Sequence, residues 1–468
     1  MIINIPIEVK DRELNPKLLI CYQLLKLSKK IKIVLTKSNI LLDKKIAKKN
    51  LIYFEKSLST HKEKLQKNFL KENHIVTLDE EGPFYHWPIA FKKNRINSQI
   101  INKSHFKFFF LWGKNEKFFF KKKILSKNKN KIIPVGHPKF DFLKKKYRSF
   151  FSKELDFIES NYKNIIFVSS SFFYDTVIDE KIYKIYIKNI IKDKKGVKQF
   201  FENFENDYEN YLSLIKLTKK IAEKFNKHTV IFRPHPRQDI NKVKSRFGKI
   251  PKNLKIIYKF TSTPWIIKSN YYIHSHCATV YEAYLLKKKI FCLRPNLKMM
   301  YERKLTEYGK FFKDSDKLVS ELFNQIKNKN SLKNKYQINS NIIRFNEEDK
   351  DSSEIIASKI IETFKNYNSE ITYKINVKKN FNSKINYKLF LLSKTKEFIY
   401  NNFKSFYIFL FEHSLINIKY IFTKDYKKNK IKTLELKEIY SFFDKIKKKN
   451  LNISCKKINN EIFEIYRK

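Results

Sequence analysis

Glycine is scarce in this sequence. Only 6 of the 468 residues are glycine. No two of them have the spacing of the G-x-G-x-x-G turn or of the G-x-x-x-x-G-K-[ST] loop, whose glycines let the backbone approach a phosphate closely. A dinucleotide-binding fingerprint of that type and a Walker A phosphate loop are therefore excluded.

Cysteine and long apolar runs are also scarce. The 4 cysteines are scattered and form no C-x-x-C pair, so neither a disulfide framework nor a zinc ribbon is indicated. No apolar run approaches the ~18 residues that a membrane-spanning helix needs. The opening stretch MIINIPIEVKDREL carries charged residues early, unlike a signal peptide. From these features we expect a cytoplasmic protein.

Acidic residues are few, and the charge balance is strongly positive. The chain has 100 Lys and Arg against 46 Asp and Glu, a formal net charge of +54. This charge suits anionic partners, and an anionic membrane surface is one candidate. A simpler interpretation of the positive charge is compositional, because Lys, Asn, Ile, Phe and Tyr dominate, as in proteins encoded by A/T-rich genomes. Lys greatly outnumbers Arg and no nucleic-acid-binding motif is present, so we expect no specific nucleic-acid partner.

The order of apolar segments predicts two α/β domains. Short strand-like runs cover 2–8, 31–36, 74–78, 164–169, 228–232, 254–258, 271–275 and 289–293, and helical patterns cover 16–27 and 208–226. Strands that alternate with helices favour parallel sheets covered by helices. We therefore predict domains over 1–145 and 155–366, joined by the basic stretch 144–151. A capping box at 351–354 would start the closing helix of the second domain.

The last part of the chain has a different composition. No proline follows Pro295 and no glycine follows Gly309. We predict a helical extension, rich in Lys and aromatic residues, over 367–468. Within it, the aromatic segment 403–422 either lies in a membrane interface or packs as an ordinary amphipathic helix.

In open α/β sheets, ligands bind at the carboxyl ends of the strands, so the residues after each predicted strand are candidate site residues. Asp79, Glu80, Glu81 and Gly82 follow the strand 74–78. Adjacent carboxylates repel one another, which raises the pKa of at least one of them, and a carboxylate here is placed to act as a general base. The alternative is a solvated acidic loop.

A proline-bounded histidine follows the strand 228–232. The residues are Arg233, Pro234, His235, Pro236 and Arg237. The prolines restrict the backbone on both sides of the imidazole, and the guanidinium groups suit a phosphate. His235 could therefore donate a proton or a hydrogen bond to a leaving phosphate. The alternative is a surface loop that contains a histidine by chance.

Hydroxyl groups follow two further strands. Ser275 and Thr279 flank a predicted helix start, where they either bind an anion or simply cap the helix. Glu282, one turn further, could accept hydrogen bonds from ribose hydroxyls. Ser170 and Ser171 follow the strand 164–169 and could contact the same phosphate.

Two remaining features complete the candidate residues. The neighbours of Ser275 include His274, His276 and Cys277, but adjacent side chains on a strand point to opposite faces, so we expect no metal site. The turn at 136–141 contains Gly136 and His137, and it forms either a hinge or a wall of the site.

Taken together, these motifs resemble the GT-B glycosyltransferases, whose fold has two Rossmann-like domains facing a cleft. Bacterial sialyltransferases of that fold carry an acidic pair followed by Gly, a His-Pro pair and a Ser/Thr pair, in this order. The resemblance implies that Glu80 is the base on the acceptor hydroxyl, with Asp79 as the alternative. It also implies that His235 contacts the nucleotide phosphate and that Ser275 and Thr279 hold it. The implied donor is a CMP-activated nonulosonate or Kdo-type sugar.

The segments IPIEVKDREL, DEEG, GHPKFD and RPHP, over residues 1 to about 300, look closer still to the surface carbohydrate biosynthesis proteins. GHPKFD is also similar to the Gly-x-Pro-Arg-x-Asp segment of CDP-glycerol glycerophosphotransferases, with Lys139 in place of Arg. We expect a metal-independent glycosyltransferase with no cofactor beyond its nucleotide-sugar co-substrate, acting on a glycan or lipid-linked acceptor. The alternatives are a transferase of the same fold that uses CDP-glycerol or a UDP-sugar, a non-catalytic basic module on membranes or RNA, and a degenerate transferase acting as a scaffold.

Overall fold

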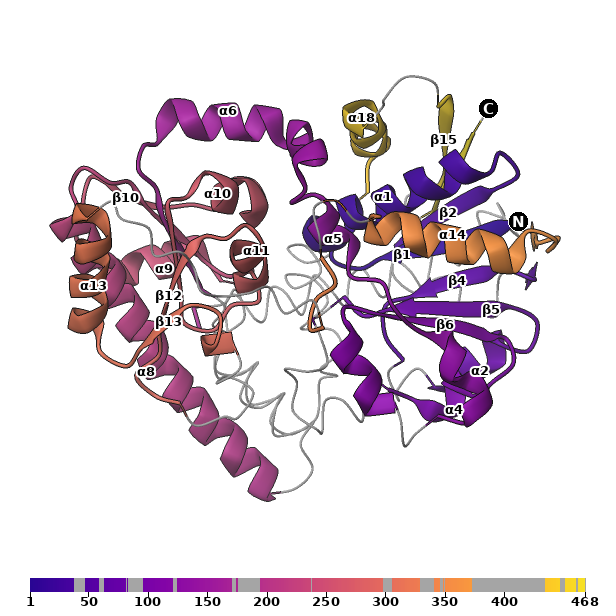
Figure 1. Ribbon diagram of the computed structural model, residues 1–468, viewed down its shortest axis with the longest axis horizontal. Coiled ribbons are helices and arrows are strands. Elements are labelled where there is room, and N and C mark those ends of the chain that lie inside the picture. Colours follow the sequence, from indigo (N-terminus) through magenta and orange to yellow (C-terminus); the bar gives the residue numbers. More distant parts are fainter. Residues whose placement is uncertain are drawn as a thin grey trace, which may run out of the picture.

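Two lobes, each a β-sheet flanked by helices, make up the part of the chain that can be described (Figure 1). The computed structural model describes residues 1–37, 47–58, 63–80, 82, 96–120, 124–170, 174–175, 194–236, 238–297, 305–328, 341–345, 348, 350–372, 434–446, 451–459 and 462–467. No helix in these ranges is long and apolar enough to cross a bilayer.

The first lobe is built on a sheet with the strand order β15-β16-β2-β1-β4-β5-β6-β7. The strands from β2 to β7 run parallel: β1 (Ile2–Ile7), β2 (Lys32–Lys37), β4 (Ile52–Glu55), β5 (His74–Leu78), β6 (Phe106–Leu111) and β7 (Ile132–Pro134). All residues of β1 and β5 are buried, as expected for parallel strands covered on both faces. The three predicted strands of this domain are thereby confirmed, while β4, β6 and β7 were missed.

Helices and short 3₁₀ turns cover this sheet. They are α1 (Lys10–Leu27), α2 (Glu63–Phe69), α4 (Ser98–Ile101), α5 (Pro138–Asp141) and the 3₁₀ helices Lys114–Phe120, Ser126–Lys131 and Lys145–Phe151. The prediction that the first helix starts at residue 16 was wrong, because α1 begins six residues earlier and Pro16 lies inside it. The extra turns carry Glu13, a buried acid of the site described below.

The second lobe contains a sheet of parallel strands only, in the order β10-β9-β8-β11-β12-β13. The strands are β8 (Ile166–Ser169), β9 (Val230–Arg233), β10 (Leu254–Ile256), β11 (Tyr271–His274), β12 (Lys289–Leu293) and β13 (Lys310–Phe312). Counted within the lobe, this is the order 3-2-1-4-5-6 of the doubly wound Rossmann fold. The five strands predicted here are confirmed within about two residues. The order reverses between β8 and β11, where such sheets bind ligands.

The helices of the second lobe lie on both sides of its sheet (Figure 1). They are α6 (Ser152–Asn161), α8 (Lys194–Lys224), α9 (Ile240–Phe247), α10 (Ser262–Lys268), α11 (Val280–Leu285) and α13 (Ser315–Lys327). The predicted helix 208–226 corresponds to the second half of α8. Its buried face includes Tyr211, Leu214 and Ile221.

The helix predicted to close the second domain belongs to the first instead. After the second sheet the chain returns, and α14 (Ser352–Phe364) packs against α1 (Figure 1). Ile356 and Ile360 of α14 are fully buried and belong to the same hydrophobic core as Leu18 of α1. An apolar helix face indicates that the helix will be buried against a sheet, but it does not indicate which sheet. The prediction used the position of the helix in the sequence and therefore assigned it to the wrong domain.

The capping box predicted for α14 is not the device that begins it. Asp351 makes no side-chain cap hydrogen bond. Asp141, from the GHPKFD turn, accepts hydrogen bonds from the backbone N–H groups of Ser352 and Ser353, both at 2.9 Å. Asp351 instead pairs with Lys144 at 3.0 Å and accepts a hydrogen bond from Tyr147 at 2.6 Å. A side chain more than 200 residues away in sequence therefore holds the helix start.

The segment 367–468 is only partly helical in the ranges described. α18 (Leu436–Ile446) is a helix, but β14 (Glu370–Thr372) pairs with β3 (Ala47–Lys49), and β15 (Ile453–Asn459) pairs with β16 (Ile462–Arg467). β16 joins β2 in antiparallel register and so extends the first sheet. The prediction of a helical extension is corrected to this extent, because β14 and β16 are stabilised by strands near the start of the chain, β3 and β2. The aromatic segment 403–422 lies outside the described residues.

Candidate functional site

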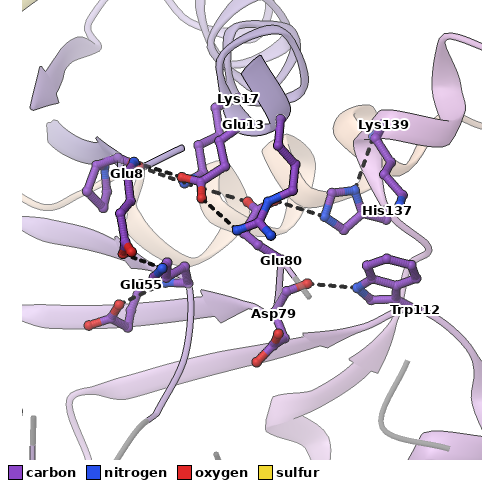
Figure 2. Close-up of polar contacts among 12 residues, drawn as sticks. Glu8, Glu13, Lys17, Glu55, Asp79, Glu80, Trp112, His137 and Lys139 are labelled. Carbon is purple, nitrogen blue, oxygen red and sulfur yellow. Dashed lines mark hydrogen bonds and ion pairs between the residues drawn. The ribbon is translucent and has the colours of Figure 1, made fainter. Parts of the chain in front are cut away.

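Glu80 lies at the carboxyl end of β5, between two basic side chains (Figure 2). Its side chain is 2% exposed. Oε1 is 3.6 Å from Lys17 Nζ, and Oε2 is 3.2 Å from His137 Nε2. Neither partner was predicted for it, because Lys17 and His137 stand about 60 residues away on either side in the sequence.

Lys17 connects Glu80 to a second buried acid. Its ammonium donates hydrogen bonds to Glu13 Oε2 at 3.0 Å and to the carbonyl oxygen of Pro6 at 2.6 Å. Burial alone would raise the pKa of Glu80, but Lys17 and His137 outweigh it and hold that pKa below its ordinary value. Adjacent acids were expected to raise a pKa, and at Glu80 the structure gives the opposite direction. Glu80 is therefore ionised at neutral pH.

His137 lies in a tight turn between Glu80 and Trp112. Its Nδ1 accepts a hydrogen bond from the backbone N–H of Lys139 at 3.2 Å, and its ring centroid is 4.7 Å from that of Trp112. Burial lowers the pKa of His137 although Glu80 opposes the shift, so the imidazole is neutral with its proton on Nε2, facing Glu80. Gly136, at φ +92°, permits this turn, since a Cβ there would lie 2.6 Å from the carbonyl oxygen of Arg344.

Besides Glu80, the structure describes Asp79 and Gly82 of the acidic segment 79–82. Asp79 is buried, and its carbonyl oxygen accepts a hydrogen bond from Trp112 Nε1 at 2.8 Å (Figure 2). Gly82 is buried with φ +133°, a conformation that favours glycine. Glu81 lies outside the described residues. The solvated-loop alternative does not fit Asp79 and Glu80, because burial and specific partners distinguish them from surface acids.

In the second lobe, hydroxyl groups gather where the strand order reverses. Ser169 Oγ lies 3.1 Å from Thr279 Oγ1 and 3.0 Å from Cys277 Sγ. Tyr272 OH is 2.7 Å from the same Thr279 oxygen. Thr279 makes no side-chain cap hydrogen bond to α11, so the simple capping alternative does not describe it. Among the residues described, Ser275 Oγ is buried and has no hydrogen-bond partner.

The turn after β9 is held by two residues that the sequence did not point to. Gln238 Oε1 accepts hydrogen bonds from the backbone N–H of His235 at 2.7 Å and from Ser170 Oγ at 3.3 Å. Tyr258 OH donates to the carbonyl oxygen of His235. Pro236 is exposed, and Ser171 lies outside the described residues. The structure thus brings Ser170 and His235 to one polar turn, because the strands that precede them, β8 and β9, are neighbours in the sheet.

Arg233 and Glu282 have partners within the second lobe. The guanidinium of Arg233 donates to the carbonyl oxygens of Phe260 at 2.7 Å and Lys259 at 3.3 Å, so part of it anchors that loop. Glu282 is buried and accepts a hydrogen bond from Thr263 Oγ1 at 2.7 Å. Both residues were predicted to bind the donor. Each retains polar atoms beyond these contacts.

The two groups of candidate residues meet where the lobes touch. Trp112 of the first lobe lies edge-on to Tyr281 of the second, with 6.2 Å between ring centroids. Both rings belong to one continuous hydrophobic core that includes residues of both sheets. The lobes therefore share a packed boundary beside Glu80 on one side and Glu282 on the other.

Nothing in the described ranges groups three or more His, Cys, Asp or Glu side chains as a metal site would. Burial lowers the pKa of His274 to about 3 and that of His276 to about 3. Burial and the nearby cation Arg294 therefore keep both imidazoles neutral.

Comparisons with known proteins give structural similarities only. No family model matches the chain, and no curated protein matches it. S. aureus MnaA bound to UDP is 12% identical, with a TM-score of 0.44 over 78% of this chain and 96% of that one. The UDP-GlcNAc 2-epimerase of Methanocaldococcus jannaschii is 14% identical, with a TM-score of 0.45 over 77% of this chain and 100% of that one.

A third solved structure, the wall teichoic acid polymerase TagF, is 12% identical, with a TM-score of 0.41 over 78% of this chain and 89% of that one. At such scores the fold assignment depends on the topology of this chain itself. That topology comprises a parallel sheet in each lobe, the order 3-2-1-4-5-6 in the second, and a packed boundary between them. The chain has a GT-B-like α/β fold with two Rossmann-like domains, as the sequence predicted.

Proposed function

We propose that this chain is a nucleotide-sugar-dependent glycosyltransferase of cell-surface glycan biosynthesis. The observation that carries the proposal is the polar set at the topological switch point of the second sheet. Ser169, Thr279 and the unpartnered hydroxyl of Ser275 lie there at the carboxyl ends of β8 and β11. Hydroxyl and backbone N–H groups at this position suit a nucleotide phosphate.

The first domain would bind the acceptor beside Glu80. The reaction would form a bond between the acceptor oxygen and the anomeric carbon, and break the bond from that carbon to the donor phosphate. The acceptor proton would pass to a carboxylate, for which we propose Glu80, with Asp79 as the alternative. Glu80 is already ionised. Its Oε2 lies 3.2 Å from His137 Nε2, so the imidazole stabilises the negative charge of this carboxylate. His235, at the turn after β9, would donate to the leaving nucleotide.

For the donor we propose a CMP-activated nonulosonate or Kdo-type sugar. This part of the proposal depends on the order of the acidic, His-Pro and Ser/Thr motifs along the chain. The leaving group would then be CMP. A donor such as CDP-glycerol or a UDP-sugar would use the same fold and the same switch point, so the identity of the nucleotide separates these candidates.

The first experiment is a thermal-shift screen of the protein against CMP, CDP, UDP, GDP and ADP. We expect a selective increase in melting temperature with CMP, because a ligand that binds only the native state stabilises it by about 2.7 kcal/mol at a hundredfold excess over its dissociation constant. The shift should shrink in Thr279→Val, which keeps shape and removes a hydroxyl, and in His235→Ala. Selective binding of UDP or CDP would change the donor, and no shift with any nucleotide would contradict the proposed function.

We also propose peripheral attachment to an anionic membrane on the cytoplasmic side. Phe118 is 70% exposed and Leu125 is 53% exposed, and exposed lysines such as Lys114, Lys117 and Lys127 lie close to them in sequence. Apolar side chains surrounded by cations suit the interface of an anionic bilayer.

This attachment predicts co-sedimentation with vesicles of mixed neutral and anionic lipids. Binding should weaken steeply as salt rises and should fall further in Phe118→Ser than in Phe323→Ser, a matched exposed phenylalanine of the second domain. Equal binding of both variants, or binding indifferent to lipid charge, would contradict attachment through this segment.

A further inference from the structure

Lys139 stands at the boundary between the domains, and the reaction proposed above does not use it. It belongs to the GHPKFD turn of the first domain and is half-buried. Its ammonium lies 4.7 Å from the ring centroid of Trp112 and 4.7 Å from that of Phe140. In the described part of the chain, no acceptor hydrogen-bonds this ammonium, so its three donors are available to a ligand.

The side chains around Lys139 place it against the second domain. The ring beneath it, Trp112, contacts Tyr281, and Tyr281 precedes Glu282 on α11. Burial lowers the pKa of Lys139, while Glu282 of the second domain and Glu80 of the first both act to raise it. The charges of one carboxylate from each domain therefore favour the charged form of this ammonium. Figure 2 shows the first-domain side of this arrangement, with Lys139 beside His137.

Arg233 is the register partner of Ser169 in the parallel pair β8–β9, so the two side chains leave the same face of the second sheet at its carboxyl edge. Burial lowers the pKa of Arg233, and the groups that oppose this shift include Asp11 of the first domain and Glu282 of the second. Ser169 Oγ lies 3.1 Å from Thr279 Oγ1, and Cys277 Sγ lies 3.0 Å from the same oxygen. Arg233 of the second domain therefore adjoins the hydroxyl cluster at the switch point. Lys139 of the first domain lies on the ring of Trp112, which contacts Tyr281, two residues after Thr279.

We propose that Lys139 and Arg233 form a pair that binds the donor phosphate across the domain boundary. The inference rests on the proposed function, since it takes the nucleotide to lie in the second domain. Lys139 would turn its three N–H donors to the phosphate. The phosphate then links the domains and brings Glu80 of the first to the sugar held by the second. A lysine carries a compact charge on a flexible stem, so its ammonium can turn from the two rings toward the phosphate.

The test compares Lys139→Met, which keeps the apolar stem and removes the charge, with Lys139→Arg, which keeps the charge. Calorimetric titration with cytidine, uridine, CMP, CDP and UDP measures the contribution of the phosphate separately from that of the base. We expect Lys139→Met to lose tenfold or more in affinity for nucleotides and nothing for nucleosides. Lys139→Arg should retain most of the nucleotide affinity. Lys153→Met, at an exposed lysine of α6, is the matched control and should bind as the wild type does.

Inorganic pyrophosphate serves as a second probe, because it has no base. Pyrophosphate binding that depends on Lys139, without binding of any nucleotide, would support the anion site and contradict the proposed function. Unchanged nucleotide affinity in Lys139→Met would overturn the inference and leave the proposed function intact. Absence of binding of every probe to the wild type would overturn both. The melting temperatures of the unliganded variants should match that of the wild type, which separates a lost contact from a folding defect.

Discussion

Replacing Lys17 by methionine should lower the free energy of unfolding by about 3–5 kcal/mol, the range found when one partner of a buried ion pair is removed. Lys17 is 1% exposed and lies 3.0 Å from Glu13 Oε2 and 3.6 Å from Glu80 Oε1. Methionine fills a similar volume, so the loss comes from charge. Both carboxylates would remain buried without their shared cation. Urea denaturation at pH 7 measures the effect.

Two further variants make this prediction specific. Lys359→Met removes an exposed cation that pairs with Glu362 on the surface of α14, and it should change stability little, because solvent screens such pairs. Glu80→Gln added to Lys17→Met should recover part of the loss, since one uncompensated charge is then gone. Equal stability of Lys17→Met and the wild type would mean that the carboxylates take up protons or solvent without cost.

Acidification should destabilise the protein steeply between about pH 6.5 and pH 4. Burial lowers the pKa of His274 to about 3 and that of His74 to about 4. The unfolded chain therefore binds protons in this window that the folded chain does not. Stability is complete above the unfolded pKa of a histidine, about 6.5, and is lost as pH falls toward the folded value. The slope amounts to about 1.4 kcal/mol per pH unit for each such proton.

Asp141 opposes this loss of stability on acidification. Burial, followed by the nearby charge of Asp351, raises the pKa of Asp141 to about 6. An acid with a raised pKa contributes stability at low pH and loses it as pH rises through the folded value. Asp141 therefore offsets part of the histidine effect between about pH 4 and pH 6, so the net slope is smaller than the histidines alone would produce.

The measurement is a series of urea transitions at pH 7, 6, 5 and 4 for the wild type, His274→Phe and His74→Phe. Each variant has one titrating imidazole fewer, so its stability should fall less steeply with pH than that of the wild type. The comparison uses slopes, and a constant offset from altered packing does not affect it. Curves that run parallel to the wild type would show that these two imidazoles are not the groups that control acid stability.

The strands of the second domain could be predicted because each carries its own signal. Runs such as 228–232 and 289–293 are short, apolar and bounded by polar or turn residues, and parallel strands that are buried on both faces have that pattern. The polar residues that follow them, Ser170, His235 and Ser275, could be proposed as site residues for the same reason. The carboxyl ends of parallel strands lie along one edge of a sheet.

The partners of these residues could not be predicted. Lys17, Glu80 and His137 come from three separate parts of the sequence, and Asp141 caps a helix that starts at Ser352. Gln238 and Tyr258 hold the turn at His235 through hydrogen bonds that no local sequence pattern predicts. The same holds for β16, whose apolar residues become a strand only beside β2.

The sequence by itself determined the α/β class with two Rossmann-like domains and the chemical types gathered at the strand ends. These follow from hydrophobic periodicity and turn residues, which act over a few positions. Only the tertiary structure decided that α14 covers the first domain, that Glu80 is ionised between Lys17 and His137, and that Lys139 lies on the ring of Trp112 at the domain boundary. Burial and charge interactions depend on which segments meet in space, and those distances are set by the packing of the whole chain.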